Sequence, residues 1–262
     1  MENKKTFETP DLSIKELSHA LYEANQALSE TIRQRNEFFA NISHDLRSPI
    51  TAIHNCIEYL QSLDRITEDD IKDVLPLLSS RSAMLEHMIN DIFLLTKLDC
   101  SEDMLHFGKV PVDAFLEDFF FMYEVDEQYS DRELLLDISD NCDTVISMDA
   151  PYMKRALDNI MKNALAHTSK GDTISLSAHS IGSYIEIIIA NTGEKISQKD
   201  LPHIFERSYM SSDSRTPDKN HGAGLGLSIC KSIIEKHGGS ISAHSIESSD
   251  RGCEFHIQLP RP

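Results

Sequence analysis

The sequence predicts a multidomain protein in which an α-helical hairpin, forming a dimeric four-helix bundle, precedes an α/β sandwich domain. Three observations lead to this fold class. Apolar residues recur every three or four positions over most of the first hundred residues. The stretch 99–111 breaks that helical pattern. Beyond it, helix-like and strand-like segments are mixed over roughly 150 residues, which is a common domain size.

Composition places the chain among ordinary soluble proteins and excludes several functions. Its 262 residues are 40% hydrophobic and 26% charged, and the net charge of −18 argues against nucleic-acid binding. We expect no membrane segment and no signal peptide, because no apolar run approaches the ~18–20 residues of a membrane span. Five cysteines without paired metal-ligand spacing indicate free thiols in a reducing compartment. A cytoplasmic location follows.

The helical hairpin is predicted from two apolar stripes. "TEDD" at 67–70 offers an N-cap with acidic residues in the first turn of the second helix. Two helices alone bury too little apolar surface, so we expect the hairpin to form a homodimer. The first stripe comprises Leu17, Leu21, Ala24, Leu28, Ile32, Phe39, Ile42, Leu46, Ile53, Ile57 and Leu60, and the second Ile71, Val74, Leu78, Leu85, Met88, Ile92 and Leu95.

The elements of the α/β domain follow from composition and spacing. Pro151 marks a helix entry, and Gly238 marks a helix end. β-branched runs bounded by turn residues predict the strands. The expected helices are 112–128, 151–168 and 225–239, and the expected strands are 133–139, 144–149, 172–180, 184–191, 240–246 and 253–259.

A histidine lies on the polar face of the first helix. At roughly 100° per residue, His44 is about 200° from the seam residue Ile42 and should face solvent. Asp45 can accept a proton from one ring nitrogen and leave the other free to attack. Ser48 follows one turn later, and Pro49 should bend the helix. Taken alone, an ordinary surface histidine is the better interpretation in a chain with twelve of them.

A glycine-rich segment suggests a phosphate site. "HGAGLGLSI" at 221–229 places Gly222, Gly224 and Gly226 before a helix, where backbone amides can surround a polyphosphate. It matches neither the dinucleotide fingerprint nor the P-loop. A flexible glycine loop is the alternative.

Polar residues of three further segments could complete a nucleotide site. Asn159 and Asn163 share one helix face, where their amide oxygens suit Mg²⁺, although asparagines also cap or pack helices. "NTGEKI" at 191–196 forms a turn at a strand end, a place to meet a base edge. Arg207 lies just before 210–221, which we expect to be a lid.

In this order, the motifs resemble those of the sensor histidine kinases of two-component systems. "SHDLRSPIT" resembles their phosphoacceptor box, "DNIMKNA" the asparagine box, "NTGEKI" and "HGAGLGLSICKSIIEKHGG" the glycine boxes, and "IFERSY" the phenylalanine box. The resemblance covers residues 15 to 260. It implies a signalling helix at 1–32, a dimerisation and histidine-phosphotransfer hairpin at 33–100, a linker at 101–112, and at 113–262 a catalytic domain of the histidine kinase, chaperone and topoisomerase ATPase type.

The resemblance also assigns roles. It implies that His44 takes the γ-phosphoryl group of ATP and passes it to an aspartate of a response regulator, with Asp45 polarising the imidazole. Ser48 would position water for dephosphorylation of the regulator. Asn163 would bind Mg²⁺. The ATP-binding residues would be Asn159, Asn163, Asn191, Gly193, Arg207, Gly222, Gly224, Leu225, Gly226 and Leu227. The chain is then expected to be the cytoplasmic portion of a membrane-anchored sensor.

Several positions depart from the family pattern. The usual adenine-binding acid is Asn191 here, and the second glycine of that box is Lys195. The common Lys-Tyr pair after the asparagine box is Ala166-His167, and Met210 replaces a frequent arginine. Because charged hydrogen bonds are about twice as strong as neutral ones, these changes predict weaker ATP binding. A kinase-impaired dimer that docks or dephosphorylates a regulator is therefore the alternative, and a chaperone-like ATPase is a more distant one.

Overall fold

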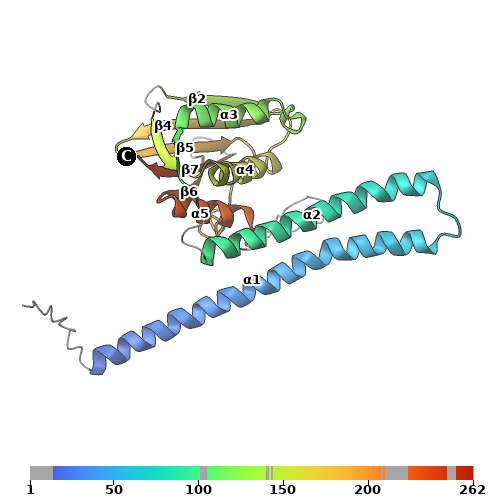
Figure 1. The fold of residues 1–262 in the computed structure, drawn as a ribbon, viewed down its shortest axis with the longest axis horizontal. Coiled ribbons are helices and arrows are strands. Elements are labelled where there is room, and N and C mark those ends of the chain that lie inside the picture. Colours follow the sequence, from blue (N-terminus) through green and yellow to red (C-terminus); the bar gives the residue numbers. More distant parts are fainter. Residues whose placement is uncertain are drawn as a thin grey trace, which may run out of the picture. The chain divides into compact units, whose positions relative to one another are not determined.

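The computed structural model describes residues 14–100, 105–139, 142, 144–207, 209, 224–246 and 252–261 (Figure 1). It divides into two compact units, Met1–Asp45 and Leu46–Pro262. Two long helices precede an α/β domain, which confirms the predicted fold class. The elements are α1 (Ile14–Ser62), α2 (Glu68–Cys100), β1 (Gly108–Pro111), α3 (Val112–Glu124), a 3₁₀ turn (Glu127–Tyr129), β2 (Glu133–Ile138), β3 (Val145–Met148), α4 (Ala150–Ala166), β4 (Thr173–Ile181), β5 (Tyr184–Asn191), α5 (Gly226–Lys236), β6 (Ser240–Ser245) and β7 (Cys253–Pro260).

The start of α2 is fixed by a reciprocal cap. The backbone N–H of Asp70 donates to the Thr67 hydroxyl at 3.3 Å, and the N–H of Thr67 donates to the Asp70 carboxylate at 2.9 Å. Two backbone donors that no helical carbonyl can reach are thereby paired. Helix α1 continues through Pro49, and α2 continues through Pro76. Within the described ranges, no helix has the length and apolar character to cross a membrane.

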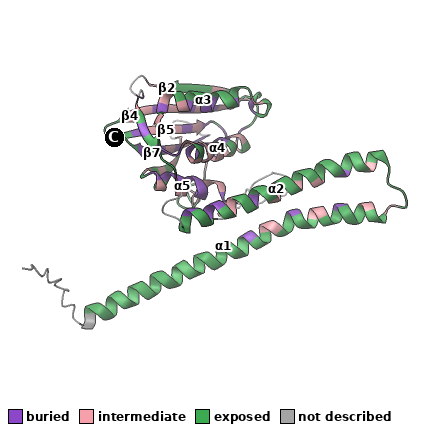
Figure 2. Ribbon diagram, in the orientation of Figure 1, coloured by how far each residue is buried: buried purple, intermediate pink, exposed green. Residues whose placement is uncertain are grey.

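The apolar stripe of α1 is largely exposed along its first half. Leu21 is 64% exposed and Leu28 is 57% exposed, whereas Ile42 is buried. Figure 2 shows the same contrast, with α1 almost entirely in the exposed class up to the middle of the helix. A regular apolar stripe without cover in one chain is what the predicted dimer requires.

The α/β domain has a self-contained core. Its main sheet has the order β2-β4-β5-β7-β6, with β2 parallel to β4 and the other neighbours antiparallel. Alternate residues of the central strands are fully buried, as expected for a sheet covered on one face by helices. Helices α3, α4 and α5 bury apolar residues in the same core. The strand residues are Ile174, Leu176, Ala178, Ile185, Ile187, Ile189, Phe255, Ile257 and Leu259, and the helix residues include Leu116, Phe120, Leu157, Ile160, Ile229 and Ile233.

Two elements differ from the sequence prediction. Strand β1 lies inside the range 101–112 that we expected to be a linker, because it pairs antiparallel with β3 along its whole length. Helix α3 ends at Glu124, four residues before the predicted end. There the Asp126 carboxylate accepts from the backbone N–H of Gln128 at 2.9 Å, and this local bond favours a short 3₁₀ turn over further helix.

Candidate active site

The predicted phosphoacceptor is an exposed histidine on α1. The side chain of His44 is 81% exposed, which confirms its predicted position away from the apolar seam. Its Nδ1 lies 3.3 Å from Oδ1 of Asp45, whose own side chain is 23% exposed. An Nδ1–H donated to this carboxylate leaves the lone pair of Nε2 directed to solvent. The pair therefore presents a nucleophilic nitrogen at the surface.

The asparagines predicted to bind nucleotide and metal lie on one face of α4. The Nδ2 of Asn159 donates to the backbone carbonyl of Gly226 at 3.0 Å, which ties α4 to the first residue of α5. This leaves the amide oxygen of Asn159 as an acceptor. Asn163 is half-exposed, and its side chain makes no hydrogen bond within the described part of the chain. Both amide oxygens are therefore available to a ligand.

The glycine-rich segment supplies the start of α5. Gly224 has a φ of +65°, a conformation that favours glycine, and Leu225 is the N-cap residue. Helix α5 begins at Gly226 and continues through Leu227, so its first backbone N–H groups lack helical partners. Such an N-terminus attracts anions such as phosphate. Gly222 and the expected lid at 210–221 lie outside the described residues.

The turn after β5 closes against the end of α4. The N–H of Glu194 donates to the carbonyl of His167 at 2.9 Å, and the His167 ring also lies 3.1 Å from the Glu194 carboxylate. A Cβ on Gly193 would be only 1.9 Å from that same carbonyl oxygen, so a larger residue would displace the turn. The position therefore requires glycine for close packing.

Asn191 is the last residue of β5, and it is 2% exposed. Its Oδ1 accepts a hydrogen bond from the thiol of Cys253 at 3.2 Å. Its Nδ2 is buried without a hydrogen-bond partner in the described residues. Cys253 was not among the predicted site residues, because no local pattern connects positions 62 residues apart.

Arg207, a predicted ATP-binding residue, has another partner in this structure. Its guanidinium makes a bidentate ion pair with Asp99, the last residue but one of α2, at 2.7 and 2.5 Å. A second ion pair, between Arg155 and Asp91 at 2.6 Å, also connects α4 to α2. Both pairs link the α/β domain to α2, and neither acid was singled out from the sequence.

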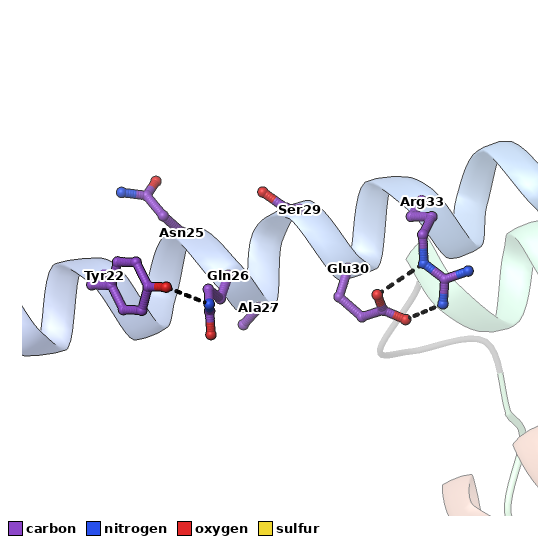
Figure 3. A pocket seen from close by; sticks show the side chains of 7 residues that line it. All are labelled: Tyr22, Asn25, Gln26, Ala27, Ser29, Glu30 and Arg33. Atoms are coloured by element: carbon purple, nitrogen blue, oxygen red, sulfur yellow. Dashed lines mark hydrogen bonds and ion pairs between the residues drawn. The ribbon is translucent and has the colours of Figure 1, made fainter.

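A shallow hollow lies elsewhere, along α1 (Figure 3). Its side chains come from a single exposed helix, where Arg33 pairs with Glu30 and Gln26 donates to the hydroxyl of Tyr22. It contains no predicted site residue. The hollow is therefore part of the surface of a single helix, and none of the predicted catalytic residues lines it. Its lining comprises Tyr22, Asn25, Gln26, Ala27, Ser29, Glu30 and Arg33.

Two known families match the two parts of this arrangement. Residues 34–101 match the His Kinase A (phospho-acceptor) domain. Residues 148–262 match the histidine kinase-, DNA gyrase B- and HSP90-like ATPases, so the α/β domain is an ATP-binding domain. The chain belongs to the sensor histidine kinases. This histidine kinase is 31% identical over 230 residues to the sensor protein SrrB of Staphylococcus aureus, covering 88% of the chain but 39% of that relative.

Solved histidine kinases share the fold at lower sequence identity. The kinase AdeS of Acinetobacter baumannii aligns with a TM-score of 0.62 at 18% identity, over 83% of this chain and 97% of that one. The kinase ThkA, solved with the response regulator protein TrrA, aligns with a TM-score of 0.70 at 20% identity, over 96% and 68% of the two chains. The full-length kinase ShkA, solved in complex with AMPPNP, aligns with a TM-score of 0.62 at 23% identity, over 86% of this chain and 45% of that one.

Proposed function

We propose that this histidine kinase phosphorylates its own His44 with ATP and passes the phosphoryl group to an aspartate of a response regulator. The main support is the combination of an exposed His44 paired with Asp45 and an ATP-binding domain in which Asn159 of α4 contacts Gly226 at the start of α5. The related structures of ThkA with a regulator and of ShkA with an ATP analogue agree with these two partners.

The chemical step uses the free nitrogen of His44. Its Nε2 lone pair attacks the γ-phosphorus, the bond from phosphorus to the bridging oxygen breaks, and ADP leaves with that electron pair. Asp45 holds the Nδ1 proton and stabilises the positive charge that develops on the ring. Positioning and charge neutralisation supply most of the catalysis in such transfers. His44 and the ATP-binding domain must come together for this step.

Magnesium fits the donors of this site. Within the described residues, no group of three His, Cys, Asp or Glu side chains could hold a metal ion. Asn163 instead offers an amide oxygen beside Asn159, and phosphate oxygens complete such a shell. When bound, the ion neutralises charge on the β- and γ-phosphates. Asn163 is thus the proposed protein ligand, and Gly224, Leu225, Gly226 and Leu227 the proposed phosphate-facing backbone.

The remaining assignments are part of the same proposal. Ser48 is exposed on α1, where it would position water for dephosphorylation of the regulator. Three further predictions belong to it. They are the domain division at 33–100 and 113–262, the homodimer formed through the hairpin, and the cytoplasmic location as part of a membrane sensor.

Labelling tests the proposal directly. The full chain is incubated with Mg²⁺ and γ-labelled ATP, and we expect label that is lost in acid but survives alkali, as a phosphoramidate does. His44→Gln should abolish labelling. His54→Gln is the matched control, because His54 is also exposed on α1, at 66%, and pairs with Glu58 of the same helix at 3.2 Å. Persistent labelling of the His44→Gln variant would remove this residue as the phosphoacceptor.

One observation favours the kinase-impaired alternative. Arg207, one of three basic residues, with Lys162 and Arg215, that could compensate for the missing phosphate contacts, is paired with Asp99. A chain whose Arg207 stays paired with Asp99 would bind or dephosphorylate a response regulator without phosphorylating its own His44. Absence of label from a folded dimer, together with faster loss of phosphate from an added phosphorylated regulator, would establish this function instead.

A further inference from the structure

The base-binding end of the nucleotide site contains an amide where the family has a carboxylate. Asn191 ends β5, and strand register places it opposite Cys253 of β7. Both side chains are buried, each at 2% exposure. The inference developed from this pair rests on the proposed function, because it concerns the nucleotide that the same site accepts.

The thiol of Cys253 determines how the amide is oriented. Burial, and then the neighbouring charge of Glu254, raise the pKa of Cys253 to about 12. The sulfur therefore keeps its proton at neutral pH and acts as a donor. Its partner at 3.2 Å is the Asn191 oxygen, which is the only acceptor atom that the side chain has. The amide nitrogen must then face away from the sulfur.

The amide nitrogen is left without an acceptor. Asn191 Nδ2 is buried, and no described residue accepts a hydrogen bond from it. Buried polar groups are normally paired, because an unpaired donor loses its hydrogen bonds to water. At the position where the resemblance places the base, the missing acceptor can come from the nucleotide.

The two purines differ in what they offer to a donor. Adenine presents an amino group beside the N1 acceptor, whereas guanine presents the O6 acceptor beside an N1–H. A carboxylate only accepts, so it pairs with the adenine amino group and repels guanine O6. An N–H donor pairs with adenine N1 or with guanine O6. We propose that Asn191, oriented by Cys253, donates to the base, so that this kinase accepts guanine as well as adenine nucleotides.

The test compares ATP and GTP binding to the full chain with Mg²⁺ by isothermal titration calorimetry. For the unaltered chain we expect dissociation constants within about tenfold of each other. Asn191→Asp should shift the ratio of the two affinities toward ATP by at least about tenfold. The carboxylate can accept a hydrogen bond from the adenine amino group, but it has no donor for guanine O6.

Cys253 is tested as a positioning residue by Cys253→Ala. Without the thiol, the amide can turn its oxygen toward the base, and the ratio should move several-fold toward ATP. Cys230→Ala is the matched control, since Cys230 is also a buried thiol of this domain but donates to the carbonyl of Ala156. A defect in folding would weaken both nucleotides equally, so only a change in the ratio reports on Asn191.

The outcomes separate this inference from the proposed kinase. ATP bound at least a hundredfold tighter than GTP, with a ratio that Asn191→Asp and Cys253→Ala leave unchanged, would overturn the inference while His44 labelling still supported the kinase. Failure of both nucleotides to bind a folded chain would overturn the inference and the proposed kinase together. A ratio near one that both variants shift toward ATP would support the inference.

Discussion

Helix α1 and the α/β domain are stabilised in opposite ways. Leu21 and Leu28 of α1 are more than half exposed, whereas Phe255 and Leu157 of the domain are fully buried. The domain has its own core, while the first half of α1 has an apolar stripe that one chain does not cover. This difference indicates that the ATP-binding domain has a core made from its own contacts, whereas the apolar stripe of α1 needs a partner surface, which we propose is a second copy of the chain.

Truncation of a core residue should have the largest effect on stability. Phe255→Ala should lower the free energy of unfolding of the α/β domain by about 3–5 kcal/mol, because it leaves a cavity in the middle of the sheet. Leu28→Ala on α1 should change it by less than about 0.5 kcal/mol. Urea unfolding followed by circular dichroism measures both.

Phe121→Ala is the matched control for this experiment, since Phe121 of α3 is 61% exposed in the same domain. Equal losses for the two phenylalanine variants would contradict a core centred on Phe255.

Charges placed in the stripe of α1 should weaken the dimer. Each buried leucine contributes about 1.5–3 kcal/mol, so Leu21→Glu with Leu28→Glu should raise the dimer dissociation constant at least about tenfold. Sedimentation equilibrium measures this constant. Gln26→Glu, about 200° around the helix from Leu28, should leave it unchanged. A double variant that dimerises normally would show that the stripe faces something other than a second copy.

The smallest expected effect is on the pH dependence of stability, and it compares a carboxylate of the α/β domain, Glu186, with a carboxylate of α1, Glu30. Burial tends to raise the pKa of Glu186, but the hydrogen bond from Gln258, the hydrogen bond and charge of His256, and the charge of His179 together lower it below its usual 4.5. A lowered pKa means that this stabilisation is present above pH 4.5 and is lost as the pH falls through the folded value. Glu186→Gln should therefore cost about 1 kcal/mol at pH 7 and nearly nothing at pH 3.

Glu30 on α1 provides the comparison for this pH experiment. Its pKa is also lowered, chiefly by the hydrogen bond from Arg33, but this pair lies on the exposed surface of α1. Glu30→Gln should leave the unfolding of the α/β domain unchanged at both pH values. A pH-independent loss in Glu186→Gln would mean that its side chain acts through packing rather than through charge.

Much of the fold could be predicted because its signals are local. The spacing of apolar residues predicted both long helices, "TEDD" predicted the cap at Thr67, and Pro151 and Gly238 predicted the ends of two helices of the domain. Strand β1 was missed because four residues containing a glycine and a proline look like a linker. Only its pairing with β3 makes it a strand.

The sequence by itself determined which residues could do chemistry. His44 is placed on the polar face by helical geometry, and Asn159 and Asn163 share a face for the same reason. Gly224 lies where a positive φ is needed before a helix.

Only the tertiary structure decided how distant residues combine. The strand order sets Asn191 against Cys253, and the packing of α4 on α5 connects Asn159 to Gly226. The contact of Arg207 with Asp99 joins residues 108 positions apart. Sheet register and helix packing are set by the sum of many weak contacts across the core, and no single stretch of sequence contains that sum.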